Sequence, residues 1–363
     1  MYDFQAYKDR TRFANLDGLR FISIAMVLWH HTPGLNTDAF VIPTRGFLGV
    51  DFFFVLSGYL ITTLLLREAD RYGSFSLKNF YIRRAIRIIP VYYFVVTCVS
   101  AYYVLVAGRT ELAELVPYYY LFLSNFLATD IPTLSPTWSL SVEEQFYLVW
   151  PLLLLLTPPR FLLPVGLVLV AVNVLGVVGL LGLKAFAWGP LWIGLPNATY
   201  APLILGALLA YLLNREDGYT ALARLLGARW TALAGAALLL AMMEFFPTDL
   251  RGFPNLAIHL TMTAILAALV IREDSIGHRV LQNAAVVRVG AVSYGIYLYH
   301  LLALDVATRS LRVLDMSDDF LRMILFWTLA YVVAEISFRT LEAYFQRFRP
   351  KPSAAPAEVG TKS

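Results

Sequence analysis

Charged residues and cysteine are scarce in this chain of 363 residues. Charged side chains make up 15% of the sequence and hydrophobic side chains 59%, whereas soluble domains are nearer a quarter charged and half apolar. The single cysteine, Cys98, excludes an internal disulfide and a zinc site built on several thiolates. No glycine-rich phosphate loop is present, which removes support for an ATP-driven mechanism of that kind. The apolar excess instead predicts a bundle of membrane-spanning helices.

Apolar runs of the length that crosses a bilayer, about 20 residues, recur along the chain. We predict an all-α, polytopic membrane helix bundle of about ten transmembrane helices. It forms one domain over residues 1–349, followed by a disordered cytoplasmic tail over 350–363. The predicted spans are 16–35, 46–66, 86–107, 138–157, 161–183, 197–213, 230–247, 253–271, 286–306 and 320–343.

One further apolar run, 115–127, is short and holds a cluster of tyrosines. Tyrosines suit the headgroup level, so the run is predicted to be interfacial or re-entrant. If it crossed the membrane instead, the C-terminus would lie on the opposite side. Most of the 29 Lys and Arg residues fall on one side of the ten-span layout. By the positive-inside rule, both termini are therefore predicted to be cytoplasmic.

The first predicted helix places a cation and an imidazole on one face. Arg20 and His31 are eleven residues apart, which returns to within about 20° of the starting direction about 16 Å along the axis. A titratable side chain inside a span is costly and is a functional candidate. His30 points about 100° away. The alternative is that both histidines are amphipathic anchors at the outer interface.

Polar residues in the second predicted helix have two interpretations each. Asp51 is either functional or a solvated residue at the start of a helix. Ser57 lies mid-membrane, where a hydrogen bond to a backbone carbonyl is the simpler expectation, and Gly58 permits close helix approach. We do not favour Ser57 as an acyl carrier.

Arginines cluster where the third predicted helix begins. Arg84 and Arg87 are three residues apart and share a face. With Arg20 at the same depth, they would form a pocket for phosphate groups. The alternative is a cluster that only sets membrane orientation, which accounts well for Arg83.

Two acidic residues and one histidine lie in the outer halves of later spans. Glu143 and Glu144 are consecutive, so one is expected to point inward and the other toward the rim. A glutamate near an imidazole orients it or acts as a second base, although an acid near a helix start is also favoured by the helix dipole. His300 is either catalytic or a satisfied polar residue, and the nearby Tyr297 favours packing.

Two other intramembrane residues, His259 and Glu335, have no neighbouring signature and receive no role. The remaining candidates sort by depth, with arginines toward the inner end and His31, Asp51, Glu143 and His300 toward the outer end. That arrangement would suit a protein that binds a polyphosphate at the inner end of the spans and activates a hydroxyl group at the outer end. We predict no metal site and no nucleic-acid partner.

Together these motifs resemble the acyltransferase-3 family of integral-membrane O-acyltransferases, over nearly the whole chain. The resemblance depends on five segments in the family's order: LDGLRFISIAMVLWHH, GFLGVDFFFVLSGYLIT, YIRRAIRIIPVYY, TWSLSVEEQFYLVWP and SYGIYLYH. It selects His31 over His30 and implies that Arg84 and Arg87 hold the phosphates of acyl-CoA. The family's other patterns fall on Trp138, Ser139 and Glu143, and on Tyr297 and His300. Many members carry a fused periplasmic hydrolase-like domain, whereas this sequence ends with a short tail after the tenth predicted helix, so we expect a standalone member.

The resemblance implies an activity in the bacterial cytoplasmic membrane. Acyl-CoA, most commonly acetyl-CoA, would enter from the cytoplasm as co-substrate, with no permanently bound cofactor. His31 would take a proton from a hydroxyl of a cell-surface carbohydrate or lipid-linked sugar, with Glu143 or Asp51 orienting the imidazole. Direct transfer and a covalent acyl-histidine both stay open. The rival functions are a proton-coupled exporter and a non-catalytic assembly protein.

Overall fold

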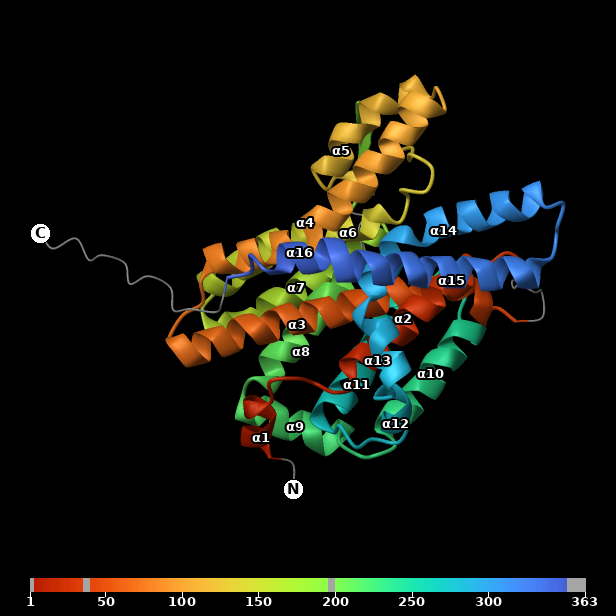
Figure 1. Cartoon of the computed structure of the whole chain (residues 1–363). Coiled ribbons are helices and arrows are strands. Elements are labelled where there is room, and N and C mark those ends of the chain that lie inside the picture. Colours follow the sequence, from red (N-terminus) through yellow and green to blue (C-terminus); the bar gives the residue numbers. More distant parts are fainter. Residues whose placement is uncertain (1–2, 35–39, 195–199, 351–363) are drawn as a thin grey trace, which may run out of the picture.

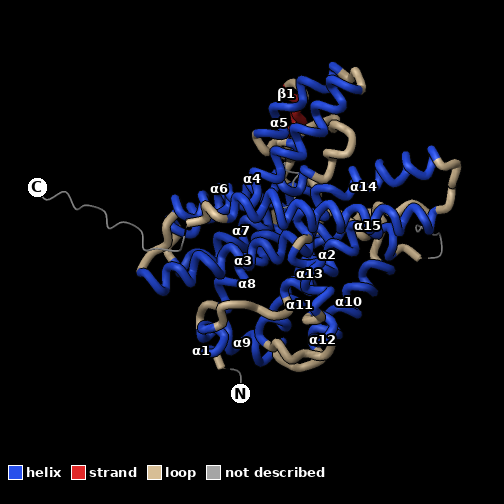
Figure 2. The backbone as a smooth tube through the Cα atoms, viewed as in Figure 1, coloured by secondary structure: helices blue, strands red, loops and turns tan. Residues whose placement is uncertain are grey.

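The computed structural model describes residues 3–34, 40–194 and 200–350, and these are mostly helical (Figures 1 and 2). Its one described sheet is a hairpin of β1 (Phe186–Trp188) and β2 (Leu191–Ile193). The predicted all-α class is therefore confirmed. The longer helices are α2 (Leu16–His30), α3 (Leu48–Tyr72), α4 (Leu77–Ala101), α6 (Thr137–Leu156), α7 (Pro159–Val177), α8 (Ala201–Leu213), α9 (Glu216–Leu226), α10 (Thr231–Phe245), α11 (Phe253–Ile271), α14 (Ser293–Val313) and α15 (Asp319–Ser337).

Shorter helices complete the chain. They are α1 (Phe4–Asp9), α5 (Val116–Tyr120), α12 (His278–Leu281), α13 (Ala284–Ala291) and α16 (Ala343–Gln346). A π-helical turn, Tyr102–Val106, extends α4 into a projection from the bundle that also holds α5 (Figure 1). The run 115–127 contains only α5 and short 3₁₀ turns, so it forms no spanning helix.

The described helices do not confirm the predicted number of spans. Six are long and apolar enough to cross a membrane, and the number rises to eight if two bent helix pairs each count as one span. The helices α2 and α8 have 15 and 13 residues, or about 22 and 20 Å of rise, against a hydrocarbon core about 30 Å thick. The sides of the termini stay a prediction, and the tail from residue 351 lies outside the described residues.

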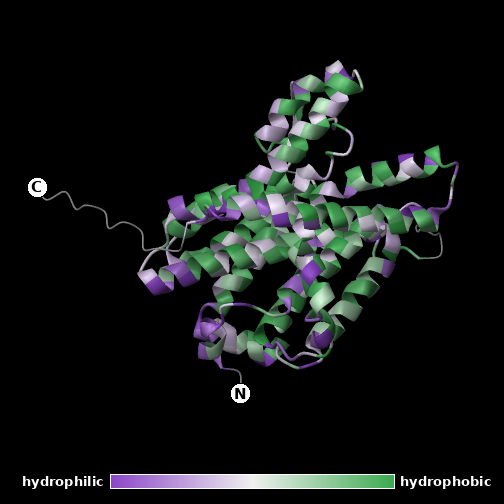
Figure 3. Cartoon of the chain, viewed as in Figure 1, coloured by the Kyte–Doolittle hydropathy of each residue, from purple (hydrophilic) through white to green (hydrophobic). Residues whose placement is uncertain are grey.

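Apolar side chains cover the outer faces of the bundle. Leu156 is 78% exposed, Phe245 84% and Leu148 60%, and Figure 3 shows hydrophobic residues along the helices with hydrophilic ones mainly near their ends. A water-soluble monomer rarely exposes so much contiguous apolar surface. The chain is a multi-pass membrane protein whose apolar helix faces contact lipid.

Local sequence signals set where the central helices begin and end. Gly73 follows α3 with φ +80°, a left-handed conformation that glycine adopts without a steric penalty. Ser76 then caps α4, because its side chain accepts a hydrogen bond from the backbone N–H of Asn79. These two residues reverse the chain between α3 and α4, so that α4 returns along the bundle.

Glycines bring α3 and α8 into backbone contact. A Cβ atom on Gly58 would lie 1.9 Å from the carbonyl oxygen of Leu203, and one on Gly206 would lie 2.1 Å from that of Val55. Small residues at such positions allow close helix packing within membranes. The contact fixes the backbone at Ser57, the residue before Gly58.

A sharp bend separates α13 from α14. The two helices meet at an angle of 72°, so the predicted span 286–306 is broken rather than straight. Gly290 of α13 packs against α2, where a Cβ atom would lie 1.8 Å from the carbonyl oxygen of Asp17. The bend brings Ser293 and Tyr294, at the start of α14, to a cavity beside α2.

Candidate active site

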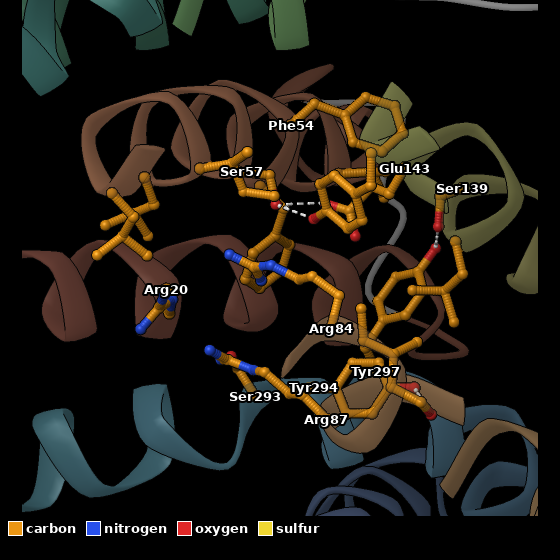
Figure 4. Close-up of a pocket in the computed structure, with 18 residues that line it drawn as sticks. Arg20, Phe54, Ser57, Arg84, Arg87, Ser139, Glu143, Ser293, Tyr294 and Tyr297 are labelled. Carbon is orange, nitrogen blue, oxygen red and sulfur yellow. Dashed lines mark hydrogen bonds between the residues drawn. The ribbon is translucent and has the colours of Figure 1, made fainter. Parts of the chain in front are cut away.

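A cavity of about 180 Å³ lies among α2, α3, α4, α6 and α14 (Figure 4). Apolar walls come from residues such as Val50, Phe53, Phe54 and Leu140. Most of the predicted site residues meet in this cavity, although they come from distant parts of the chain. Its polar lining consists of Arg20, Ser57, Arg84, Arg87, Ser139, Glu143, Tyr147, Ser293, Tyr294 and Tyr297.

Three arginines, Arg20, Arg84 and Arg87, form the part of the cavity that we call the arginine end. Arg20 donates a hydrogen bond to Asp17 at 2.8 Å. The Arg84 guanidinium lies over the Tyr147 ring, 5.3 Å from its centroid. Among the described residues, neither Arg84 nor Arg87 has a hydrogen-bond or ion-pair partner. Unpaired guanidinium groups of this kind suit an anionic ligand such as a phosphate.

A carboxylate and two hydroxyl groups meet beside the arginines. Ser57 Oγ donates a hydrogen bond to Glu143 Oε1 at 2.6 Å and lies 2.8 Å from the Tyr147 hydroxyl. The expectation that Ser57 bonds a backbone carbonyl is therefore wrong, because Glu143 offers its side chain a stronger, charged acceptor. Tyr147 received no role from the sequence. Its position four residues after Glu143 places both on one face of α6 and could have indicated it.

Another pair of hydroxyl groups lines the cavity, one near the start of α6 and one on α14. Ser139 Oγ and the Tyr297 hydroxyl are 2.6 Å apart (Figure 4). Both also donate to the carbonyl oxygen of Pro136. Trp138 does not line this cavity and packs edge-on against Phe54, with ring centroids 6.0 Å apart. The Ser139–Tyr297 pair ties the start of α6 to α14.

Beyond Tyr297, the imidazoles of His31 and His300 meet with ring centroids 4.8 Å apart. His31 Nδ1 lies 2.9 Å from the carbonyl oxygen of Val27, and His300 Nδ1 lies 2.5 Å from that of Tyr297. A carbonyl only accepts, so each Nδ1 carries the proton and each Nε2 is an unprotonated base in the neutral imidazole. His300 is fully buried, and its Nε2 has no partner among the described residues. We call this pair the histidine end.

The profile of the acyltransferase domain family matches residues 13–336. The chain belongs to this acyltransferase family. The match covers α2 to α15, so it includes each helix that lines the cavity.

The chain is also similar to curated relatives that are longer than it is. It is 28% identical to peptidoglycan O-acetyltransferase OatA of Listeria monocytogenes over 93% of this chain and 58% of the relative. It is 27% identical to a putative O-acetyltransferase of Staphylococcus aureus over 95% of this chain and 59% of the relative. It is 28% identical to putative peptidoglycan O-acetyltransferase YrhL of Bacillus subtilis over 90% of this chain and 54% of the relative. The chain thus spans somewhat over half the length of these relatives. No solved structure matches it.

The expected hydrogen bond from a carboxylate to His31 is not formed among the described residues. Its Nδ1 is held by the Val27 carbonyl of its own helix, while Glu143 contacts Ser57. Asp51 instead contacts His259 of α11, with Oδ2 3.1 Å from Nε2. Sequence analysis missed this buried pair because its members are 208 residues apart.

One further expectation needs correction. Glu335 is not a lone acid, because its carboxylate accepts hydrogen bonds from Arg288 and Arg339 at 2.6 and 2.5 Å. Arg83 pairs with Glu68 at 2.6 Å, so it has a structural partner as well as a charge that favours one side of the membrane. Glu144 is largely buried, and its Oε1 has no hydrogen-bond partner among the described residues.

Proposed function

We propose that this acyltransferase moves an acyl group, chiefly acetyl, from cytoplasmic acyl-CoA to a hydroxyl of a cell-envelope carbohydrate. The observation that supports this most directly is one cavity that holds three arginines together with the Ser57–Glu143–Tyr147 cluster. The histidine end lies next to the same cavity, because His300 and Tyr297 share a ring contact at 5.5 Å. Anion binding, acyl transfer and proton acceptance thus have adjacent places along one path.

The arginine end is the proposed site for the phosphates of acyl-CoA. Arg84 and Arg87 have unused donors, and a guanidinium is always charged, which suits a phosphate clamp and not proton transfer. The positive-inside bias of the sequence supports a cytoplasmic position for this end, where acyl-CoA would be available. The thioester would then extend toward Ser57 and Glu143.

The histidine end is the proposed site of proton acceptance. The imidazole of His31 is partly exposed, and its Nε2 is free of a proton in the neutral form, as argued above. A neutral imidazole is a suitable general base near pH 7. The acceptor hydroxyl would approach His31 from the outer side, with His300 facing the same space.

The relatives' names support the proposed acceptor class. Two of the three are named as peptidoglycan O-acetyltransferases, one of them putatively. We therefore propose a glycan hydroxyl of the cell wall, or of its lipid-linked precursor, as the acceptor. The chain covers somewhat over half of those proteins' lengths, so the acceptor needs its own test.

The test measures the O-acetyl content of cell-envelope glycans by NMR in a deletion strain complemented with different variants. Wild type should restore the acetyl signal, and His31→Ala at equal membrane levels should reduce it by about 100-fold or more, the usual loss for a general base. His278→Ala is the matched control, because its Nδ1 also bonds a backbone carbonyl, at 2.9 Å, outside the cavity. An unchanged acetyl signal in the deletion strain would contradict the proposal and favour the exporter.

A further inference from the structure

The hydrogen bonds at Ser57 have a defined direction. Ser57 Oγ donates to Glu143 at 2.6 Å, so its single proton is used there. The Tyr147 hydroxyl, 2.8 Å away, must then donate to Ser57, because two hydroxyl groups at that distance need one donor. The order is Tyr147 to Ser57 to Glu143. A hydroxyl whose proton is directed at a carboxylate is set up to lose that proton during nucleophilic attack.

The backbone at Ser57 cannot shift easily. Gly58 fixes α3 against α8 by the close contact with Leu203 described above. Ser57 meanwhile faces the cavity, and Figure 4 shows its hydroxyl between the arginines and the Ser139–Tyr297 pair. A nucleophile fixed in this position loses little further conformational entropy when it reaches the geometry needed for attack.

Ser57 also lies between the proposed phosphate site and the proposed base, which are far apart. Arg20 and His31 are separated by about 16 Å along α2, so a phosphate clamp and a base for the acceptor lie at opposite ends. Ser57 lines the same cavity as Arg20, Arg84 and Arg87, and Tyr297 connects that cavity to His300. An acyl group held at Ser57 would be accessible from both ends.

We propose that Ser57 is a covalent acyl carrier in the transfer, an inference that rests on the proposed function. In the first half of the reaction, Ser57 Oγ attacks the thioester carbonyl. The new C–O bond forms and the C–S bond breaks. Glu143 takes the serine proton, and CoA leaves as a thiolate at the arginine end, where it takes a proton from solvent. The product is an acyl ester of Ser57.

In the second half, the acceptor hydroxyl attacks that ester. A C–O bond to the acceptor forms and the bond to Ser57 breaks, while Glu143 returns its proton to Ser57 Oγ. His31 Nε2 takes the acceptor's proton and releases it to solvent on its own side. The enzyme is restored, and the acyl group has moved from sulfur to the acceptor oxygen.

The experiment uses the purified full chain in proteoliposomes with acetyl-CoA and no glycan, followed by mass spectrometry of the intact protein and its peptides. With no glycan to accept the acetyl group, wild-type and His31→Ala protein should both accumulate one acetyl group on Ser57. Glycan added afterwards should remove that group rapidly from wild type and slowly from His31→Ala. Ser57→Ala should lose the adduct and reduce glycan acetylation by more than about 100-fold. Ser57→Cys should carry the acetyl group as a thioester that neutral hydroxylamine removes, a result that a merely structural serine would not give.

The control is Ser100→Ala, which removes a buried hydroxyl of α4 outside the cavity. It should form the adduct and acetylate glycan as wild type does. Glycan acetylation that survives in Ser57→Ala, an adduct on Tyr147 or a histidine, or turnover with no adduct in any variant would each overturn the carrier role and leave the proposed function intact. Wild-type protein that neither binds acetyl-CoA nor acetylates glycan would refute the proposed function itself, and the carrier role with it.

Discussion

Replacement of Gly58 by alanine tests whether the α3–α8 contact holds the site together. The added Cβ would lie 1.9 Å from the carbonyl oxygen of Leu203. A relaxed carbon–oxygen contact is about 3.3 Å, so the helices must separate by about 1.4 Å. No side-chain rotation can relieve the clash, because the contacted atom belongs to the backbone. The separation would also move Ser57 away from Glu143.

The expected cost combines two opposing effects. Overpacking costs about 1–3 kcal/mol and sometimes more, and a backbone clash belongs at the upper end. Alanine recovers about 1 kcal/mol of helix propensity relative to glycine. The net loss is about 2 kcal/mol, which lowers the unfolding midpoint of a chain of this length by about 3 °C.

The matched control is Gly166→Ala in α7, which packs against the same helix α8. Its Cβ would meet Leu208 Cδ2 at 2.5 Å, the terminal methyl of a side chain that can change rotamer for about 1 kcal/mol. The propensity gain offsets that cost, so its midpoint should stay near wild type. Both midpoints are measured by thermal unfolding of detergent-solubilised protein, together with glycan acetylation in membranes. A Gly58→Ala protein as stable and active as Gly166→Ala would refute the reasoning.

Three further predictions concern other contacts. Arg84→Ala should weaken acetyl-CoA binding by about 10-fold or more, and the loss should shrink at high salt, as isothermal titration at two ionic strengths would reveal; equal binding would exclude Arg84 from the clamp. His259→Phe should lower stability by about 3 kcal/mol because it leaves the Asp51 carboxylate buried without its partner, and the added change Asp51→Asn should recover part of that loss in thermal unfolding. Phe54→Ala enlarges the cavity wall, so the rate with butyryl-CoA relative to acetyl-CoA should rise in a CoA-release assay, whereas an unchanged ratio would show that Phe54 does not limit acyl length.

Helical periodicity predicted the arginine end well. Arg84 and Arg87 share a face of α4, and a depth estimate put Arg20 at their level; all three line one cavity. Such predictions succeed because spacing within a helix fixes which side chains share a face, and membrane charge bias fixes which helix ends share a depth. Ser139 was assigned only through the family resemblance, and it lines the same cavity.

Contacts between distant helices could not be predicted in that way. Depth alone grouped Asp51 and Glu143 with His31, but residues at one depth can face different neighbours around the bundle. Asp51 turns to His259 of α11, and Glu143 turns to Ser57 of α3. Which helices are neighbours depends on packing such as the Gly58–Leu203 contact, whose partner lies far away in the sequence. The span count deviates for a related reason, since buried helices such as α8 need not be long enough to cross alone.

The two histidines illustrate what local sequence does determine. His31 Nδ1 bonds the carbonyl four residues before it, and His300 Nδ1 bonds the one three residues before it. Both partners belong to the histidine's own helix, so each tautomer is set by the helix and needs no carboxylate. Glu143 can therefore accept the hydrogen bond from Ser57 while His31 is still oriented by the Val27 carbonyl. A carboxylate at Ser57, inside the cavity, and imidazoles beside it thus provide proton acceptors at two separate positions, as the proposed acyl transfer requires.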